Sequence, residues 1–255
     1  MRLDIVIPAH NEERRIGRTL SGYRRRLVDP EVRFIVALDA CTDATDQVVR
    51  FHMAQDERVH TLQLPKLGKG GVIREAFARS DADLVGFVDA DGATPPAELM
   101  RLAEAARDAD GAIATRRHPA AVVPVGRSLP RRMTSAGFAF GVRALLRLPY
   151  RDTQCGAKVL RRESAERILP SLTSSDLSFD VDMLLAAHEH GQQIVELPTV
   201  WIDRQGSRVR PVRDTRRMGG SLLKLWARHE IRRRGAGPTP GTQLQPAGEV
   251  AHAVR

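Results

Sequence analysis

Cysteine, long apolar runs and internal repeats are scarce or missing in this sequence. The two cysteines cannot build a disulfide scaffold, and they fit a reducing cytosol. No apolar run approaches the roughly 20 residues of a membrane-spanning helix. The first strand-like segment already carries Asp4, so we expect no signal peptide before it. These absences exclude collagen, coiled coils, integral membrane proteins and small secreted modules.

The chain does contain enough apolar sequence for a core, and its charge is unevenly distributed. Its 255 residues are 42% apolar, which suits one large α/β domain or two small ones. The net charge is +9, and residues 204–234, with eleven Lys and Arg against two acidic residues, account for all of it. Nucleic acid, an anionic membrane surface or a phosphorylated substrate could attract this segment, and a solvated surface helix is the alternative.

Short apolar runs alternate with amphipathic stretches over the first half of the chain. We expect strands at 3–8, 32–38, 59–64, 84–88 and 111–115, and helices at 12–27, 43–51, 72–79 and 95–106. Asn11 is the expected N-cap of the first helix. The alternation predicts a doubly wound, mostly parallel α/β sheet, in which ligands bind beyond the carboxyl ends of the strands. Farther along we expect helices at 132–146 and 179–190, and strands at 155–160 and 194–201.

Polar residues follow the expected strands. Asp89 and Asp91, two residues apart after the fourth strand, can share one hard divalent cation such as Mg²⁺ or Mn²⁺. Asp39 ends the second strand and can accept hydrogen bonds from a base or a ribose hydroxyl. Lys69 lies in a glycine-rich turn before a helix, where backbone N–H groups favour a phosphate. Together these residues predict a metal-bound nucleoside diphosphate, whereas each alone is equally a loop acid or a flexible turn.

Several short motifs follow one another in a fixed order over about residues 3–210. They are PAHNEE (8–13), LDACTDAT (38–45), GKGGVIR (68–74) and DADGAT (89–94), then DTQCGAK (152–158), FDVD (179–182), ELPTVW (196–201) and GSRV (206–209). The first four resemble blocks of the inverting family 2 glycosyltransferases, which have the GT-A fold. The last four resemble blocks of the dolichyl-phosphate β-glucosyltransferase and polyprenyl-phosphate glycosyltransferase subgroup.

The resemblance implies transfer of a hexose to a polyprenyl phosphate, with UDP-glucose as first-choice donor and GDP-mannose as second. It implies a nucleotide-sugar site formed by Pro8, His10, Glu12, Asp39, Lys69, Asp89 and Asp91. Asp89 and Asp91 would also hold the Mg²⁺ or Mn²⁺. Contacts to the acceptor or its phosphate are implied for Arg117, Arg131, Gln154, Lys158 and Ser207. His10 stands where the family has tyrosine, so stacking on the base is expected to depend on pH.

The acceptor decides whether a catalytic base is needed. A phosphate monoester is largely anionic at pH 7 and can attack unaided, whereas a hydroxyl acceptor needs a carboxylate within hydrogen-bond reach. Asp180 is the first candidate for this base and Asp182 the second, with a helix cap as the structural alternative for Asp180. Cys155 is not expected to be a nucleophile, because no histidine lies near it, and a packed, buried thiol is expected instead.

The sequence divides into a GT-A domain at 1–214, a basic amphipathic helix at 215–234 and a disordered tail at 235–255. One helix face would bind an anionic bilayer or pack on the domain or on a second subunit; it carries Met218, Leu222, Leu225, Trp226 and His229. We therefore expect a cytoplasmic protein, peripheral on the inner face of the membrane, that could be an oligomer. A soluble hydroxyl acceptor and a nucleotidyltransferase stay open as alternatives. Nucleic acid is not an expected partner, because it leaves the carboxylates unexplained.

Overall fold

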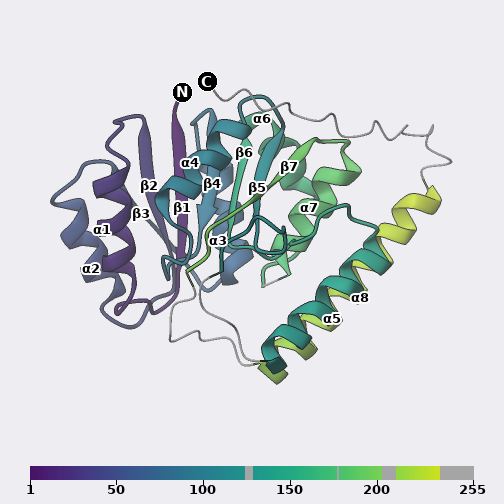
Figure 1. Cartoon of the computed structure of the whole chain (residues 1–255). Helices are drawn as coiled ribbons and strands as arrows, with labels where there is room; N and C mark the ends of the chain where they lie inside the picture. Colours follow the sequence, from purple (N-terminus) through teal and green to yellow (C-terminus); the bar gives the residue numbers. More distant parts are fainter. Residues whose placement is uncertain (124–128, 177, 203–210, 236–255) are drawn as a thin grey trace.

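A sheet of seven strands forms the centre of the molecule (Figure 1). This is a computed structural model, which describes residues 1–123, 129–176, 178–202 and 211–235; the side chains of 129–136, 211–218 and 233–235 lie outside that description. The strands are β1 (Leu3–Ala9), β2 (Val32–Asp39), β3 (Val59–Leu64), β4 (Leu84–Val88), β5 (Gly111–Thr115), β6 (Ala157–Arg161) and β7 (Ile194–Pro198). Their order in the sheet is β3-β2-β1-β4-β6-β5-β7.

The sheet is parallel except for β6, which runs antiparallel to both β4 and β5. β1 lies between β2 and β4, with Ile5 opposite Phe34 on one side and Gly86 on the other. The carboxyl ends of β1, β2 and β4 therefore meet at one edge, and the turn that leads into β6 arrives at the same edge. This arrangement confirms the expected mostly parallel α/β fold.

Alternate strand residues belong to two separate cores, one on each face of the sheet. Ile5 and Ile7 of β1 lie in the core that includes α1, α2 and α4, whereas Val6 of β1 and Phe87 of β4 lie in the core that includes α3, α6 and α7. Because helices cover both faces, the central strands are apolar on both sides. The helices are α1 (Ile16–Arg26), α2 (Thr45–Met53), α3 (Gly68–Arg79), α4 (Pro96–Ala105), α6 (Arg162–Ile168) and α7 (Phe179–Glu189), and the 3₁₀ turn η1 (Leu169–Ser171) follows α6.

Two further helices, α5 (Leu129–Leu146) and α8 (Pro211–Gly235), lie side by side at the α7 end of the molecule (Figure 1). Leu222 and Leu225 of α8 are buried in the same core as α7, and Nδ1 of His229 lies 2.7 Å from Glu189 of α7. Part of the apolar face expected to bind a bilayer or pack on protein therefore packs on the domain. The expected tail at 236–255 lies outside the described residues.

Over the part of the chain that the structure describes, no helix combines the length and the apolar character of a membrane span.

Candidate active site

The loops that follow β1 and β2 are joined by hydrogen bonds at the strand-end edge. The Asn11 backbone is left-handed, with φ of 57°, a conformation that asparagine tolerates better than most residues. Its Oδ1 accepts a hydrogen bond from the Thr42 backbone N–H at 2.8 Å. The Glu12 N–H donates to Thr45 Oγ1 at 2.7 Å. The expectation that Asn11 caps the first helix was wrong, because its side chain is taken up by the second loop and α1 begins at Ile16.

His10 and Asp39 connect these loops to the turn before α3. Nδ1 of His10 lies 2.7 Å from the Asp39 carbonyl oxygen, which can only accept, so Nδ1 carries the hydrogen. The buried Asp39 carboxylate accepts the N–H groups of Leu67 and Gly68 at 2.6 and 3.2 Å, and the Lys66 ammonium at 2.9 Å. Burial acts to raise the pKa of Asp39, but Lys66 and the two N–H groups together lower it below its usual value. Asp39 is therefore an anion that shapes this turn.

Glu12 forms a two-pronged ion pair with Arg15, with both nitrogen–oxygen distances at 2.6 Å. The charges of Asp91 and Asp89 also act on the Arg15 guanidinium. Arg15 was missing from the sequence-based set, although its place three residues after Glu12 was a usable signal. Pro8 lies in β1 opposite Ala37, close to the start of the same loop.

Asp89 and Asp91 stand at the end of β4, as the sequence predicted. Oδ1 of Asp89 lies 2.9 Å from the Lys69 ammonium. A Cβ atom on Gly156 would lie 1.8 Å from Oδ2 of Asp89, so any side chain at this position would displace the carboxylate or the turn. Burial and the neighbouring Asp89 charge raise the pKa of Asp91, which shows that negative charge here is incompletely balanced. Hard oxygen ligands with excess negative charge suit a divalent cation, although the described residues hold no cluster of three or more metal-ligating side chains.

Lys69 and Lys158 link this edge to the first turn of α7. Asp180 forms ion pairs with the Lys158 ammonium and with the Lys69 ammonium, the latter at 3.3 Å. Both ammonium groups lie over the Phe87 ring, 5.2 and 5.3 Å from its centre. Burial acts to raise the pKa of Asp180, but the two lysines lower it below its usual value. A chain of alternating charges therefore runs from Asp89 through Lys69 and Asp180 to Lys158.

The glycines around Lys69 have a packing role. A Cβ atom on Gly70 would lie 2.5 Å from the Phe179 Cβ and 2.8 Å from the Ser174 carbonyl oxygen. The Gly70 N–H donates to the Ser175 carbonyl oxygen at 3.0 Å. The close contact between α3 and the start of α7 brings Lys69 to Asp180, a reason for glycine that the sequence did not suggest.

Asp182 lies two residues after Asp180 in α7 but has different partners. It accepts the backbone N–H groups of Thr173 and Ser174 at 2.8 and 2.7 Å, and it forms an ion pair with Arg228 of α8. These bonds hold the segment before α7 and fasten α8 to the domain. The described contacts thus give Asp182 a structural task, and none of them connects it to Asp89 or Lys69.

Another ion pair, which the sequence did not predict, lies beside the turn before β6. Arg116 contacts Asp152 through Nε at 2.7 Å and Nη2 at 2.8 Å, and its guanidinium lies 4.9 Å from the centre of the Trp201 ring. The Asp152 N–H donates to Glu196 at 2.8 Å. Burial raises the pKa of Asp152 and Arg116 lowers it, with a net result of about 2. The motif that contains Asp152 was a weak signal of this ion pair, because an aspartate that becomes buried on folding needs a cation as its partner.

The residues expected to contact the acceptor are placed unevenly. Lys158 is 1% exposed and bonded to Asp180, so an acceptor cannot reach its ammonium without a rearrangement. Gln154 lies in the turn before β6, and Arg117 is exposed just after β5. The Arg131 backbone belongs to α5, but its side chain lies outside the described part of the chain, as does all of Ser207. Cys155 is buried, and burial raises the pKa of its thiol to about 12, which agrees with an inert thiol.

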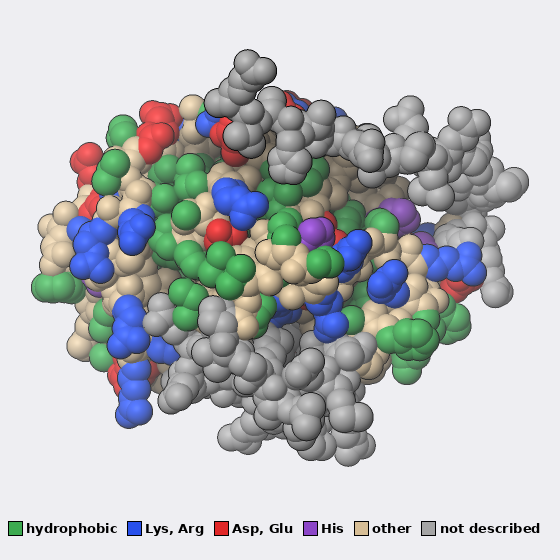
Figure 2. All heavy atoms as spheres, viewed as in Figure 1, with side chains coloured by type: hydrophobic (Ala, Val, Ile, Leu, Met, Phe, Trp, Pro, Cys, Tyr) green, Lys and Arg blue, Asp and Glu red, His purple; other side chains and the backbone are tan. Residues whose placement is uncertain are grey.

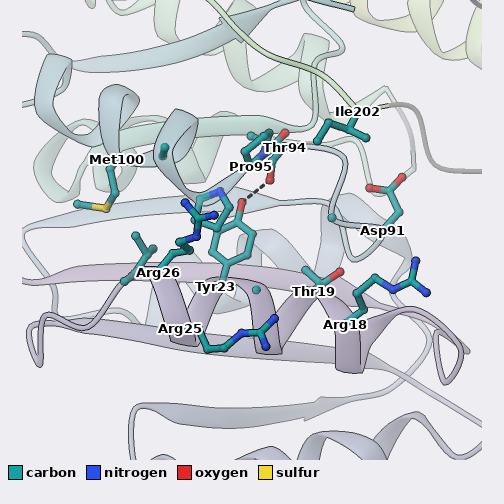
Figure 3. Close-up of a pocket in the computed structure, with 15 residues that line it drawn as sticks. Arg18, Thr19, Tyr23, Arg25, Arg26, Asp91, Thr94, Pro95, Met100 and Ile202 are labelled. Atoms are coloured by element: carbon teal, nitrogen blue, oxygen red, sulfur yellow. Dashed lines mark hydrogen bonds between the residues drawn. The ribbon is translucent and has the colours of Figure 1, made fainter. Parts of the chain in front are cut away.

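A pocket of about 550 Å³ lies between α1 and α4 and reaches Asp91 (Figure 3). In the close-up, Arg26 and Met100 lie at one end, Tyr23 and Pro95 in the middle, and Asp91 at the other end. The Tyr23 hydroxyl donates to the Thr94 carbonyl oxygen at 2.9 Å. Figure 2 shows Lys and Arg side chains on both flanks of this face of the molecule, with apolar side chains between them.

Residues 4–169 match the family model of glycosyl transferase family 2. The chain is 32% identical to the Haloferax volcanii glycosyltransferase AglD, over 92% of this chain and 38% of that protein. It is 32% identical to the human dolichyl-phosphate beta-glucosyltransferase, over 89% of this chain and 76% of the relative. It is 32% identical to the Micrococcus luteus undecaprenyl-phosphate mannosyltransferase, over 80% and 85%.

Solved structures share the fold. The chain matches Mycobacterium tuberculosis glucosyl-3-phosphoglycerate synthase, crystallised with Mn²⁺, UDP and glucosyl-3-phosphoglycerate, with a TM-score of 0.65. The identity is 18%, over 89% of this chain and 80% of that one. At this identity the likeness establishes a shared architecture.

Proposed function

This chain belongs to glycosyltransferase family 2, and we propose that it moves a hexose from a nucleotide sugar to a polyprenyl phosphate. Glucose from UDP-glucose is the first-choice donor, because a dolichyl-phosphate beta-glucosyltransferase is among its relatives. Mannose from GDP-mannose is the second choice, because an undecaprenyl-phosphate mannosyltransferase is another. In this proposal the acceptor attacks the anomeric carbon directly, the nucleoside diphosphate leaves, and the configuration is inverted.

The observation that carries the donor site is the set of charges at the end of β4. Asp89 and Asp91 are the residues that would hold a Mg²⁺ or Mn²⁺ ion, which would neutralise charge on the departing diphosphate. Lys69 supplies a positive charge beside them, with its ammonium 2.9 Å from Asp89. Burial acts to lower the pKa of Lys69, but Asp180 and Asp89 raise it above its usual value, so the ammonium keeps its proton. A cation beside a developing anion stabilises the transition state.

The nucleoside lies, in this proposal, against the joined loops after β1 and β2. Pro8 lies near the end of β1 and His10 follows that strand, and the His10 ring donates a hydrogen bond to the carbonyl oxygen of Asp39, the last residue of β2. Glu12 acts through Arg15, since its carboxylate is taken up by that guanidinium. Arg15, on which the charges of Asp91 and Asp89 act, would then contact the diphosphate.

The surroundings of the Asp180 carboxylate favour a phosphate acceptor over a hydroxyl acceptor. This carboxylate is buried between Lys158 and Lys69, which lower its pKa, and a carboxylate held in that state is a weak proton acceptor. A phosphate monoester attacks without a base, so transfer to it does not need Asp180 as a proton acceptor. A soluble hydroxyl acceptor with Asp180 as base is the second candidate, and it requires Asp180 to leave one of its lysines.

The exposed side of α5 and α8 is the surface that would face an anionic bilayer. Phe140 of α5 and three residues of α8, Leu223, Trp226 and Ile231, are exposed, and Lys224 and Arg232 lie among them. This set differs from the face expected from the sequence, because Leu222, Leu225 and His229 are buried. Apolar side chains among cations suit the interface of an anionic membrane. Flotation with anionic and neutral liposomes tests it, and equal recovery with both would contradict it.

Label transfer is the experiment that tests the function. Purified protein is incubated with Mn²⁺ or Mg²⁺, a polyprenyl phosphate, and labelled UDP-glucose or GDP-mannose, and is then extracted with organic solvent. We expect metal-dependent label in the organic phase with UDP-glucose. The Asp91→Asn protein should give at least about a hundredfold less label in that phase. Label that stays in water as a new glycoside would support the soluble-acceptor candidate instead.

A further inference from the structure

Lys69 stands between two carboxylates with different surroundings. Its ammonium lies 2.9 Å from Oδ1 of Asp89 and 3.3 Å from Oδ2 of Asp180. Asp180 has a second cation in Lys158, whereas the ion pair of Asp89 is with Lys69. The side chains of Lys69 and Asp89 are 19% and 32% exposed, so this end of the charge chain opens toward the strand-end edge.

We propose that Lys69 competes with the divalent cation for Asp89, and that Asp180 sets the strength of this competition. The inference rests on the metal-binding role proposed above for Asp89 and Asp91. An ammonium and a metal ion both need the Asp89 carboxylate, and the pair already formed must loosen before a metal binds there. Asp180 gives Lys69 a second counter-charge, so that the loosened ammonium is not left unpaired in a largely buried place.

Lys158 keeps Asp180 in position for this exchange. The Lys158 ammonium donates to Asp180 and, at 2.8 Å, to the Cys155 carbonyl oxygen, and it is 1% exposed. A buried cation held by a carboxylate, a carbonyl and the face of Phe87 has no room to leave. The inner end of the charge chain is therefore fixed, and Lys69 at the outer end is the group that can shift. Asp180 and Lys158 are positioning residues that act on Asp89 through Lys69.

This competition predicts opposite effects for two neighbouring substitutions. Lys69→Met removes the competitor, and Asp180 keeps Lys158 as its partner, so Mn²⁺ should bind more tightly. Asp180→Asn removes the alternative partner and leaves Lys69 wholly on Asp89, so Mn²⁺ should bind more weakly. If these residues only supported the local fold, both substitutions would weaken the site. The sign of the change therefore separates the two explanations.

The experiment measures Mn²⁺ binding directly, without donor or acceptor. Free Mn²⁺ is titrated by electron paramagnetic resonance against the full-length wild type and each variant, and circular dichroism melting reports the fold. We expect the Mn²⁺ dissociation constant to fall about tenfold in Lys69→Met and to rise about fivefold in Asp180→Asn. Lys69→Arg keeps the positive charge and should stay within about threefold of wild type. Arg79→Met, which removes an exposed cation at the other end of α3, is the matched control and should change binding less than about twofold.

Each outcome separates this inference from the proposed function. Unchanged or weaker Mn²⁺ binding in Lys69→Met overturns the competition, and this variant carries the test alone if Asp180→Asn does not fold. Tighter binding in a folded Asp180→Asn protein also overturns it. If wild type binds Mn²⁺ and Asp91→Asn does not, the proposed metal site is supported even when the competition fails. A wild type that binds no Mn²⁺ overturns both.

Discussion

The loops after β1 and β2 and the segments around the end of β4 share one edge of the sheet, but they are held by different forces. The first pair is joined mainly by side-chain hydrogen bonds to backbone groups, such as Asn11 to Thr42 and Thr45 to Glu12. The second is held by ion pairs that are partly or fully buried, in Lys69, Lys158 and Asp180. A single hydrogen bond contributes about 1 kcal/mol, whereas breaking a buried ion pair costs roughly 3–5 kcal/mol.

Because of this difference, we expect the first region to tolerate substitutions better than the second. Losing one bond in the first region leaves several neighbours that still define the loop. Losing one charge in the second leaves another charge buried and unpaired. The charged region also lies where a departing diphosphate would develop charge. Substitutions there should therefore lower the rate of transfer as well as the stability of the fold. Four substitutions test this comparison, in order of decreasing effect.

Asp91→Asn should have the largest effect. It removes one of the two carboxylates proposed to hold the metal while keeping the shape of the side chain. We expect metal-dependent transfer to fall by at least about a hundredfold, because the charge stabilisation of the leaving group is lost. The melting temperature should change little, since burial and Asp89 already destabilise the Asp91 anion. Transfer at the wild-type rate would remove Asp91 from the site.

Gly156→Ala should have the next largest effect. The new methyl group would stand 1.8 Å from Oδ2 of Asp89, so the carboxylate or the turn must move. A displacement of about 1 Å in a catalytic group costs up to roughly a hundredfold, and we expect a fall between about tenfold and a hundredfold in kcat. Gly137→Ala is the matched control, since a Cβ there meets no described atom. An unchanged kcat in Gly156→Ala would show that the position of Asp89 is not critical.

The ionisation of Asp152 should make the free energy of unfolding depend on pH in the acid range. Because Arg116 lowers the pKa of Asp152 from the usual 3.8 to about 2 against the effect of burial, folding favours the ionised form. This stabilisation is fully present above about pH 4 and disappears as the pH falls toward 2, and its size is about 2 kcal/mol. Urea unfolding at several pH values should show that slope in wild type and a shallower one in Asp152→Asn. Asp46→Asn, in an exposed pair with Arg50, should leave the slope unchanged.

Thr45→Val should have the smallest effect. It removes the hydroxyl that accepts the Glu12 N–H at 2.7 Å and donates to the Asp43 carboxylate, and it keeps the size of a fully buried side chain. We expect a loss of about 1 kcal/mol in the free energy of unfolding and a transfer rate within about threefold of wild type. A loss of transfer as large as that of Gly156→Ala would erase the proposed difference between the two regions.

The sheet could be predicted from the sequence because its signals are local. The runs 3–8, 32–38 and 84–88 are apolar and strand-length, and buried strands need no more than that. The pair Asp89 and Asp91 was also visible, since two carboxylates directly after a buried strand must lie at the ligand edge. The predicted place of Asn11 failed for the opposite reason. Its partner, Thr42, is 31 residues away, and a local capping pattern cannot reveal it.

The sequence by itself determined the class of fold, the order of its motifs and the carboxylates at the end of β4, because apolar periodicity and short motifs are written in neighbouring residues. Only the tertiary structure decided which charges face one another. Asp180 meets Lys69 across 111 positions and Lys158 across 22, and Arg116 meets Asp152 across 36. Electrostatic energy depends on distance in space and on burial, and both quantities exist only once the chain has folded.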